Sequence, residues 1–218
     1  LILKRSKKNC FGFLPKIRQE HLVSLSKSEA IGCDHRIRLV LDEYRLRVEK
    51  GLVQSDAESL IALLALRQIA SEYKLPAVSI FVNELIKEGE SVVLFSSFLK
   101  PLKLLHNYLG GFLLTGEHSL EEREFAVESF QKGKKNLLLT TYRTGGFGYT
   151  LHRARHVVLL ERPWTPGDIT QAEDRCHRIG MKDSLTSHWF KLGFIDELVD
   201  SLIASKNEKI NIFIDDES

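Results

Sequence analysis

Apolar positions follow two different patterns along the chain. In the first pattern, apolar side chains recur at mixed helical spacing through charged stretches, from Ile37 to Val48 and again from Leu60 to Ile69. Pro76 then opens a further amphipathic segment, Val78 to Ile86, which Gly89 closes. This part of the chain is therefore predicted to be helical.

From residue 91 on, short and uninterrupted apolar runs alternate with amphipathic stretches. The apolar runs are strand candidates at residues 91–95, 112–114, 136–140, 157–160 and 185–192. Helices are expected between them at residues 99–109, 119–130 and 165–180, and after them at about 195–205. Strands that are apolar on both faces are typical of a parallel sheet covered by helices on both sides. The pattern predicts one α/β domain with a mostly parallel sheet, preceded by a helical N-terminal extension.

Composition narrows the class of protein. The 218 residues are 43% hydrophobic and 28% charged, which is typical of a globular protein. The chain is long enough to bury a hydrophobic core without disulfides or structural metal ions. The three cysteines, Cys10, Cys33 and Cys176, form no C-x-x-C pair, so we expect an intracellular protein without a disulfide framework or a cysteine-based zinc site. No apolar run approaches the roughly 20 residues of a membrane helix, so no membrane partner is expected. The first residues show neither an initiating Met nor an apolar leader, which favours a piece of a longer protein.

Charged residues are unevenly distributed, although the formal net charge is only +2. Residues 1–20 carry a net charge of +5, and residues 207–218 carry a net charge of −3. The basic segment could contact a phosphate backbone, or it could be a solvated linker, and its charge alone leaves both interpretations open.

Three loops at predicted strand ends carry groups that suit phosphate. They are 96–98 with Ser97, 115–116 with Gly116, and 140–148 with Arg143, Gly145 and Gly148. In open α/β sheets the ligand binds outside the carboxyl ends of the strands, and backbone amides beside glycine can approach a phosphate closely. Taken alone, each loop is equally consistent with an ordinary turn that binds no ligand. Three in series favour a polyphosphate or a nucleic-acid strand over a small metabolite.

The segment 165–180 is predicted to be a helix with signals at both ends. Thr165 can cap its N-terminus, Pro166 occupies the favoured first position, and Gly180 suits the C-terminal stop. Ala172 and Cys176 fall on a small, apolar stripe fit to pack on the sheet. His177 is expected to make a structural hydrogen bond rather than to transfer a proton.

On this predicted helix Gln171, Arg175 and Arg178 share one polar stripe. Two arginines one turn apart would converge on one anionic target, and the planar, permanently charged guanidinium suits phosphate. The alternative is a solvated helix in which Arg175 pairs with Glu173 or Asp174, and the spacing leaves both interpretations open.

No metal site is expected on these residues. The runs 39–43 and 212–217 look like a strand that ends in a magnesium-holding acid, but the first lies inside a helical pattern and the second near residue 218. Neither run follows a G-x-x-x-x-G-K-[ST] loop, which the sequence does not contain.

Taken together, these segments resemble the motifs of one family, the SWI/SNF-type DNA-dependent ATPases of helicase superfamily two, in their second RecA-like lobe. The resemblance rests on YRTGGFG at residues 142–148, WTP at 164–166 and QAEDRCHRIGM at 171–181. Tyr142, Thr165 and Met181 depart from the family pattern at the edges of its motifs, which bears on the coupling of ATP to DNA more than on the identity of the lobe.

The resemblance implies a RecA-like three-layer sandwich that forms half of an ATP-driven translocase or remodeller on double-stranded DNA. It divides the chain into an inter-lobe linker (1–20), a helical extension (21–90), a RecA-like helicase C-terminal domain (91–206) and a C-terminal tail (207–218). ATP with Mg²⁺ would be bound mainly by the first RecA-like lobe, so these residues alone should be inactive as an ATP hydrolase. A nucleoprotein complex is a candidate substrate. The compartment would be the cytoplasm or nucleoid in a bacterium or archaeon, and the nucleus in a eukaryote.

The resemblance also gives individual residues a role. Arg175 and Arg178 would be arginine fingers, which stabilise charge on a transferring phosphoryl group, and Gln171 and Gly148 would support the nucleotide. Contacts to the DNA backbone are expected from Ser97, Gly116, Arg143, Gly145 and Trp164. The alternative function is a catalytically degenerate lobe that serves only as a DNA-binding or protein-interaction module. The intact pair of arginines favours the motor.

Overall fold

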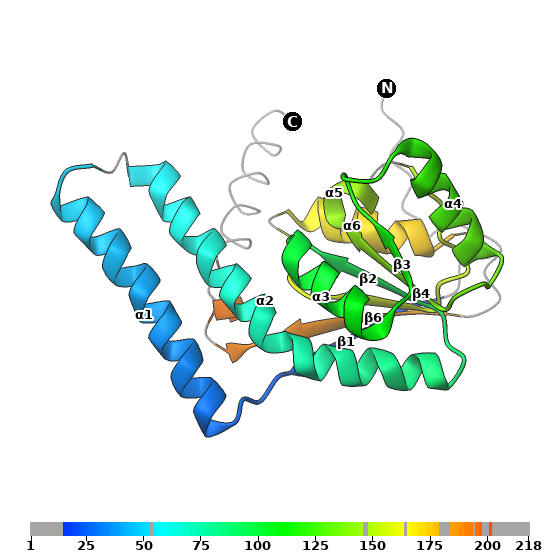
Figure 1. The fold of residues 1–218 in the computed structure, drawn as a ribbon, viewed down its shortest axis with the longest axis horizontal. Helices are drawn as coiled ribbons and strands as arrows, with labels where there is room; N and C mark the ends of the chain where they lie inside the picture. The colour runs from blue at the N-terminus through cyan, green and yellow to red at the C-terminus, as the bar shows by residue number, and fades with distance from the viewer. Residues whose placement is uncertain are drawn as a thin grey trace, which may run out of the picture.

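Six parallel strands form one sheet in the part of the chain that the structure describes (Figure 1). This computed structural model describes residues 15–52, 55–145, 148–163, 165–178, 184–193, 195–197 and 201. The strands are β1 (Lys16–Leu22), β2 (Val92–Ser96), β3 (Phe112–Leu114), β4 (Leu137–Thr141), β5 (His156–Leu159) and β6 (Leu185–Lys191). Their order across the sheet is β1-β6-β5-β2-β4-β3, and every neighbouring pair is parallel. The predicted parallel α/β sheet is confirmed.

Helices cover both faces of the sheet, which becomes the middle layer of a sandwich. The helices are α1 (Lys27–Glu49), α2 (Ser55–Lys87), α3 (Leu99–Leu109), α4 (Leu120–Gln131), α5 (Tyr142–Gly145) and α6 (Pro166–Cys176). Val93 and Phe95 of β2 belong to a buried cluster with α4 and α6, whereas Val92 and Leu94 belong to a second cluster with α2 and α3. Double burial therefore explains the uninterrupted apolar runs, and the three-layer RecA-like architecture is confirmed.

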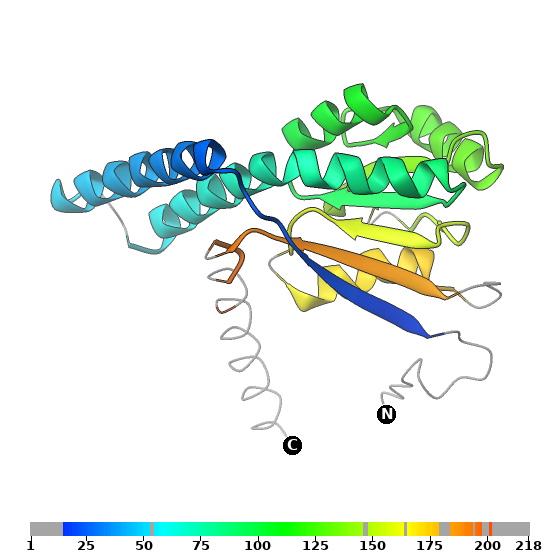
Figure 2. The same ribbon diagram turned by 90° about the horizontal axis from the view of Figure 1, so that it is seen from below.

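A helical hairpin of α1 and the first half of α2 projects beyond the sheet (Figures 1 and 2). A capping box at Ser26 and Glu29 begins α1, because each of these residues satisfies the other's backbone amide. A small cluster around Cys33, Leu66 and Ala70 holds the two helices together. This hairpin corresponds to the predicted helical extension.

Helix α2 continues through Pro76, where the sequence predicts the beginning of a separate helix. That prediction is wrong. A proline inside a helix removes one hydrogen bond and costs about 3 kcal/mol. Val78 and Val82 are fully buried after the proline, as is Ala70 before it, so packing on both sides outweighs that cost. The helix bends between its two halves (Figure 1).

The edge strand β1 lies where the sequence analysis places a linker and the start of the helical extension. Residues 16–22 pair in parallel with β6, from Lys16 opposite Leu185 to Leu22 opposite Lys191. Residues 16–20 are therefore part of the sheet and not of a linker. Strand β1 exposes most of its side chains, so its mixed sequence, KIRQEHL, lacks the apolar run that reveals the buried strands.

Three histidines on neighbouring strands form a chain across one face of the sheet. His21 Nε2 lies 3.0 Å from His188 Nδ1, and His188 Nε2 lies 2.9 Å from His156 Nδ1. Phe81 and Phe190 pack against the rings of this histidine chain. Burial and the charges of the two neighbouring histidines lower the pKa of His188 to about 3.

Candidate functional site

The three loops predicted to bind a phosphate chain lie together at the carboxyl edge of the sheet. Ser96 pairs with Thr141 across β2 and β4, and Leu114 pairs with Thr140 across β3 and β4. The residues that follow these strands, Ser97, Gly116 and Arg143, are therefore neighbours on one edge. The side chains of Ser97 and Arg143 are exposed, and no atom lies within 4 Å of the position of a Cβ on Gly116. This carboxyl edge offers a hydroxyl, a guanidinium and an open backbone approach to one ligand.

A buried carboxylate, Glu161, organises this edge from below. Its Oε1 accepts a 2.8 Å hydrogen bond from Ser96 Oγ, and its Oε2 accepts one of 2.8 Å from the Ser97 amide. Burial raises the pKa of Glu161, although hydrogen bonds from Ser71, Ser97 and Ser96 act in the opposite direction. Since the Ser97 amide is already used by Glu161, only the Ser97 hydroxyl remains to face a ligand.

Two side chains lock the neighbouring loops to this carboxylate's strand. The Tyr142 hydroxyl donates to the Glu161 carbonyl, and its ring stacks on Phe95. Arg67 of helix α2 donates to the Arg162 carbonyl and, at 3.3 Å, to Ser97 Oγ. Tyr142, which departs from the family's Ser or Thr, thus ties the loop after β4 to the end of β5.

Helix α6 begins as predicted and ends earlier than predicted. Thr165 Oγ1 accepts from the Asp168 amide at 3.2 Å, and Pro166 occupies the first turn. The helix stops at Cys176, and His177 is extended with φ −86° and ψ 95°. The Leu151 amide donates at 2.8 Å to the Arg175 carbonyl, one of the last carbonyls of the helix, which lack a partner within the helix.

The predicted stripe of Gln171, Arg175 and Arg178 is therefore only partly correct. Gln171 and Arg175 lie on α6, with Gln171 exposed and Arg175 half-buried. Arg178 is exposed, but it follows the end of the helix and does not extend the stripe. His177 is buried, as expected of a structural residue.

The two groups of predicted site residues lie apart. Helix α6 begins after the carboxyl end of β5 and runs back along the sheet, so that its last turn bonds to Leu151. The neighbouring carbonyl of Thr150 accepts from Gln131, at the end of α4, just before β4 begins. The end of α6 that carries Arg175 thus points toward the amino ends of the strands, away from Ser97 and Arg143.

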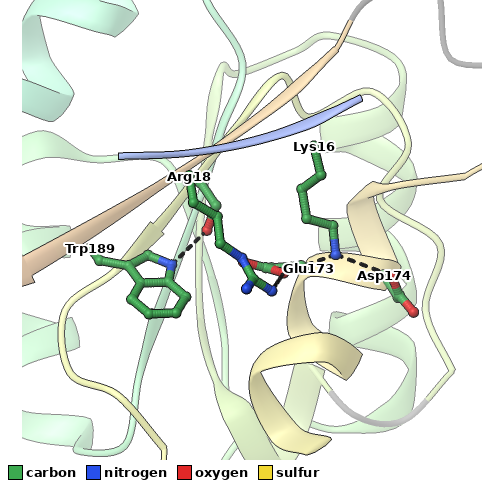
Figure 3. Close-up of polar contacts among 6 residues, drawn as sticks. Lys16, Arg18, Glu173, Asp174 and Trp189 are labelled. Atoms are coloured by element: carbon green, nitrogen blue, oxygen red, sulfur yellow. Dashed lines mark hydrogen bonds and ion pairs between the residues drawn. The ribbon is translucent and has the colours of Figure 1, made fainter. Parts of the chain in front are cut away.

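The Glu173 side chain is fully buried beneath α6 and binds two cations of β1 (Figure 3). Arg18 donates to it from Nε at 3.1 Å and from Nη2 at 2.7 Å, and Lys16 Nζ donates at 2.8 Å. Burial by itself raises the pKa of Glu173, but the hydrogen bonds from Arg18 and Lys16 outweigh it, and the pKa lies below its ordinary value. Two cations of the basic N-terminal segment are thus paired with carboxylates of α6, which favours neither a free linker nor a DNA contact for them.

Three predicted residues remain, of which Gly145 and Gly148 follow β4 in the chain. Gly145 ends the short helix α5. Gly148 has a φ of 83°, a left-handed conformation that favours glycine, and it is exposed with nothing within 4 Å of a Cβ. Trp164 lies outside the described residues.

Sequence reasoning missed the roles of Glu161, Arg67 and Glu173. An acid directly after a buried strand, as at Glu161, was a usable signal. The partners of Arg67 and Glu173 are distant in sequence, so no local pattern indicates them.

Two other kinds of site are absent from the described residues. No group of three or more His, Cys, Asp or Glu side chains that could hold a metal ion occurs among the described residues. No helix in the same residues is long and apolar enough to cross a membrane.

Comparison of the sequence with known proteins gave matches to helicases and to SNF2 proteins. Residues 76–180 match the helicase conserved C-terminal domain. The SNF2 domain-containing protein ENL1 of Oryza sativa subsp. japonica is 32% identical over 133 residues, which cover 58% of this chain and 14% of ENL1. The lymphoid-specific helicase of Homo sapiens is 39% identical over 103 residues, which cover 44% of this chain and 12% of that helicase. Helicase SWR1 of Eremothecium gossypii is 31% identical over 113 residues, which cover 49% of this chain and 8% of SWR1. The matched region is therefore a small part of these relatives.

Solved structures share the fold. The C-terminal part of the Fun30 ATPase domain superposes with a TM-score of 0.68 at 17% identity, over 87% of this chain and 88% of that one. The SWI2/SNF2 ATPase core domain of Sulfolobus solfataricus gives a TM-score of 0.68 at 24% identity, over 88% of this chain and 43% of that one. The same core in complex with dsDNA gives 0.67 at 23% identity, over 88% and 44%.

Proposed function

The chain is a C-terminal RecA-like lobe of the SNF2-type ATPases in helicase superfamily two, and from this premise we propose that it is the second half of an ATP-driven motor that moves along double-stranded DNA. One observation carries the proposal: the lobe presents two separate surfaces for anions. One is the carboxyl edge with Arg143, and the other is the end of α6 with Arg175 and Arg178. A motor needs both, because it must grip DNA and ATP independently.

The α6 surface is proposed to face the nucleotide. Hydrolysis of ATP with Mg²⁺, held mainly by the first RecA-like lobe, would supply the free energy. Arg175 and Arg178 would place permanent positive charge where the phosphoryl group becomes more negative, an effect worth roughly 10³–10⁵ in rate for an arginine finger. Gln171 and Gly148 would support the nucleotide. The absence of a G-x-x-x-x-G-K-[ST] loop from the sequence fits a lobe that completes a site and does not form one alone.

The carboxyl edge is proposed to hold the DNA backbone. Arg143 would pair with phosphate, while the Ser97 hydroxyl, the backbone at Gly116 with its open approach, and the backbone amide of Gly145 would donate hydrogen bonds. Contacts of this kind carry no sequence information, so movement should be independent of sequence. The structure of the Sulfolobus core with dsDNA supports the choice of duplex over single strands. Relatives that are named as regulators of chromatin make a nucleoprotein complex a candidate substrate.

The test is a separation of functions in the full-length protein with both lobes. Arg175→Ala or Arg178→Ala should lower the DNA-stimulated kcat by roughly 10³-fold or more and leave DNA affinity close to unchanged. Arg178→Lys should rescue little, because an ammonium cannot reproduce the planar guanidinium fork. Arg143→Ala should do the opposite and weaken DNA binding together with its stimulation of hydrolysis.

Arg38→Ala, which removes an exposed arginine of α1 paired with Asp34, is the matched control and should behave as wild type. DNA-stimulated hydrolysis that survives in Arg178→Ala would contradict the motor assignment. Binding of DNA without any hydrolysis by the wild-type protein would support the binding module instead.

A further inference from the structure

The ion-pair cluster formed by Lys16, Arg18 and Glu173 joins β1 to the helix that carries the proposed arginine fingers. We propose that Glu173 is a positioning residue, which fixes the last turn of α6 against β1 so that Arg175 and the following Arg178 are held in their productive position. This inference rests on the proposed function. It adds a residue that neither touches the nucleotide nor the DNA.

The contacts fix both the distance and the direction of the helix. Arg18 binds both carboxylate oxygens of Glu173 through Nε and Nη2, a bidentate arrangement that tolerates little rotation. Lys16 Nζ bridges Glu173, at 2.8 Å, and Asp174, at 3.4 Å (Figure 3). Two consecutive residues of α6 are therefore tied to one strand.

Arg18 is in turn held in place by an aromatic side chain of β6. The Arg18 guanidinium lies 5.2 Å from the centre of the Trp189 ring of β6, and the Trp189 indole N–H donates to Ser187 Oγ at 2.9 Å. Arg162, which follows β5, lies 4.6 Å from the centre of the same ring. The anchor for α6 is thus built from three adjacent strands rather than from one flexible side chain.

The position of Glu173 on α6 explains why its main effect should be on the orientation of the helix. Glu173 precedes Arg175 by two residues, and side chains two apart on a helix do not face the same way, so Glu173 acts through the backbone. The helix ends one residue after Arg175, where no further turn stiffens it. The carboxylate is fully buried with cations that are partly exposed, at 18% for Lys16 and 48% for Arg18. Since both cations reach solvent, removing the charge of Glu173 leaves no ion buried without a partner, and the loss of stability should therefore be small.

The ion-pair cluster of Lys16, Arg18 and Glu173 would also couple Arg175 and Arg178 to the segment that connects the two lobes. In the proposed motor the chain enters this lobe through the residues before β1, and the first described cation of β1, Lys16, contacts the finger helix directly. A change in the direction of that path would reach α6 through this contact.

The experiment uses the full-length protein and separates kcat from binding. Glu173→Gln keeps the shape of the side chain and removes its charge. We expect it to lower DNA-stimulated kcat by about 10- to 100-fold, the cost of a small misplacement of a catalytic group, with little change in DNA affinity or melting temperature. Arg18→Gln should have a similar effect, and the double variant should be no worse than Glu173→Gln alone, because the two residues act as a unit. Arg18→Lys, which keeps the charge but not the fork, should recover part of the rate.

The matched control is Glu20→Gln, which breaks the ion pair of Glu20 with Lys191 on the same strand pair without touching α6. It should keep the wild-type rate. If Glu173→Gln fails to fold, the half-exposed Arg18→Gln carries the test. A wild-type kcat in Glu173→Gln or Arg18→Gln overturns this inference and leaves the proposed function standing. A loss of rate that is accompanied by a loss of thermal stability and of DNA affinity also overturns it, because it would indicate a structural role. A wild-type protein without DNA-stimulated hydrolysis overturns the proposed function, and the inference with it.

Discussion

The histidine chain of His21, His188 and His156 predicts that mild acid destabilises this lobe. Each neutral imidazole has one donor and one acceptor nitrogen, so the three rings can bond head to tail. If His188 is protonated, both of its nitrogens donate and both neighbours must accept, so the histidine chain can hold only one charge. In the unfolded chain each histidine takes up its own proton. The folded state therefore binds fewer protons than the unfolded state, and its stability falls as the pH falls.

The size of the effect follows from the pKa of His188, which burial first and the neighbouring histidines second lower from 6.5 to about 3. The stabilising contribution is complete above the unfolded value of 6.5 and decreases as the pH drops toward 3. One pH unit corresponds to about 1.4 kcal/mol for a group that stays neutral, so His188 alone removes about 2 kcal/mol between pH 6.5 and pH 5. Burial also lowers the pKa of His21 and of His156, and these half-buried rings add smaller amounts.

The measurement is the free energy of unfolding of the 218-residue chain in urea, from about pH 7.5 to about pH 5, for wild type and His188→Gln. Glutamine keeps a donor and an acceptor but does not titrate, so the acid-induced loss should be smaller by about 2 kcal/mol in the variant. Comparing variants also removes the opposite contribution of Glu161, whose pKa burial raises. His35→Gln, at an exposed position of α1, is the control and should follow wild type. Equal pH dependence in His188→Gln and wild type would refute the reasoning.

Three other expectations follow from the structure. Gly111→Ala should lower the free energy of unfolding by about 1–3 kcal/mol, because φ is 91° and the new Cβ would lie 2.8 Å from the Leu137 carbonyl oxygen. Gly110→Ala, at a φ of 72° but in open space, should lower it by less. Equal losses in the two variants would contradict the steric argument. Lys74→Met should cost about 3–5 kcal/mol, since it leaves Asp196 buried without the ammonium now 2.6 Å away, and adding Asp196→Asn should recover part of the loss in urea titrations. Phosphate release by the isolated chain should stay at background with or without duplex DNA, because a P-loop sequence is lacking; stimulated turnover would reveal a complete site.

Five of the six described strands could be predicted, including the edge strand β3, whereas the edge strand β1 could not. Strands β2, β4 and β5 are covered on both faces, so their sequences are continuous apolar runs that local inspection finds. Strand β1 has a single neighbour and mostly exposed side chains, so the same inspection passes over it. At Pro76 the local sequence predicted a break that is not present, because packing on both sides of the proline stabilises a helix that proline disfavours.

The candidate site divides in the same way. Ser97, Gly116 and Arg143 could be placed on one edge because parallel strands end together, and that rule needs no knowledge of side-chain contacts. The end of α6 at Cys176 was not predicted, because Gly180 is the stop signal in the local sequence and the Leu151 amide that bonds to the carbonyl of Arg175 is distant in the chain. The partners of Glu173 are equally distant, more than 150 positions away in Lys16 and Arg18.

The pairing of β1 with β6 also has a consequence for the order in which the protein is made. Lys16 and Leu185 are about 170 residues apart, and at a synthesis rate of about 5–20 residues per second β1 leaves the ribosome roughly 10–30 s before its partner exists. Throughout that interval an unpaired strand is presented to other nascent chains and to chaperones. Of the six described strands, β1 is synthesised first and is the last that can dock, and the carboxylate of Glu173 meets its cations only in that closing step. Completion of the described sheet thus joins an early and a late segment of the chain, and helix α6 is not held by Lys16 and Arg18 before that step.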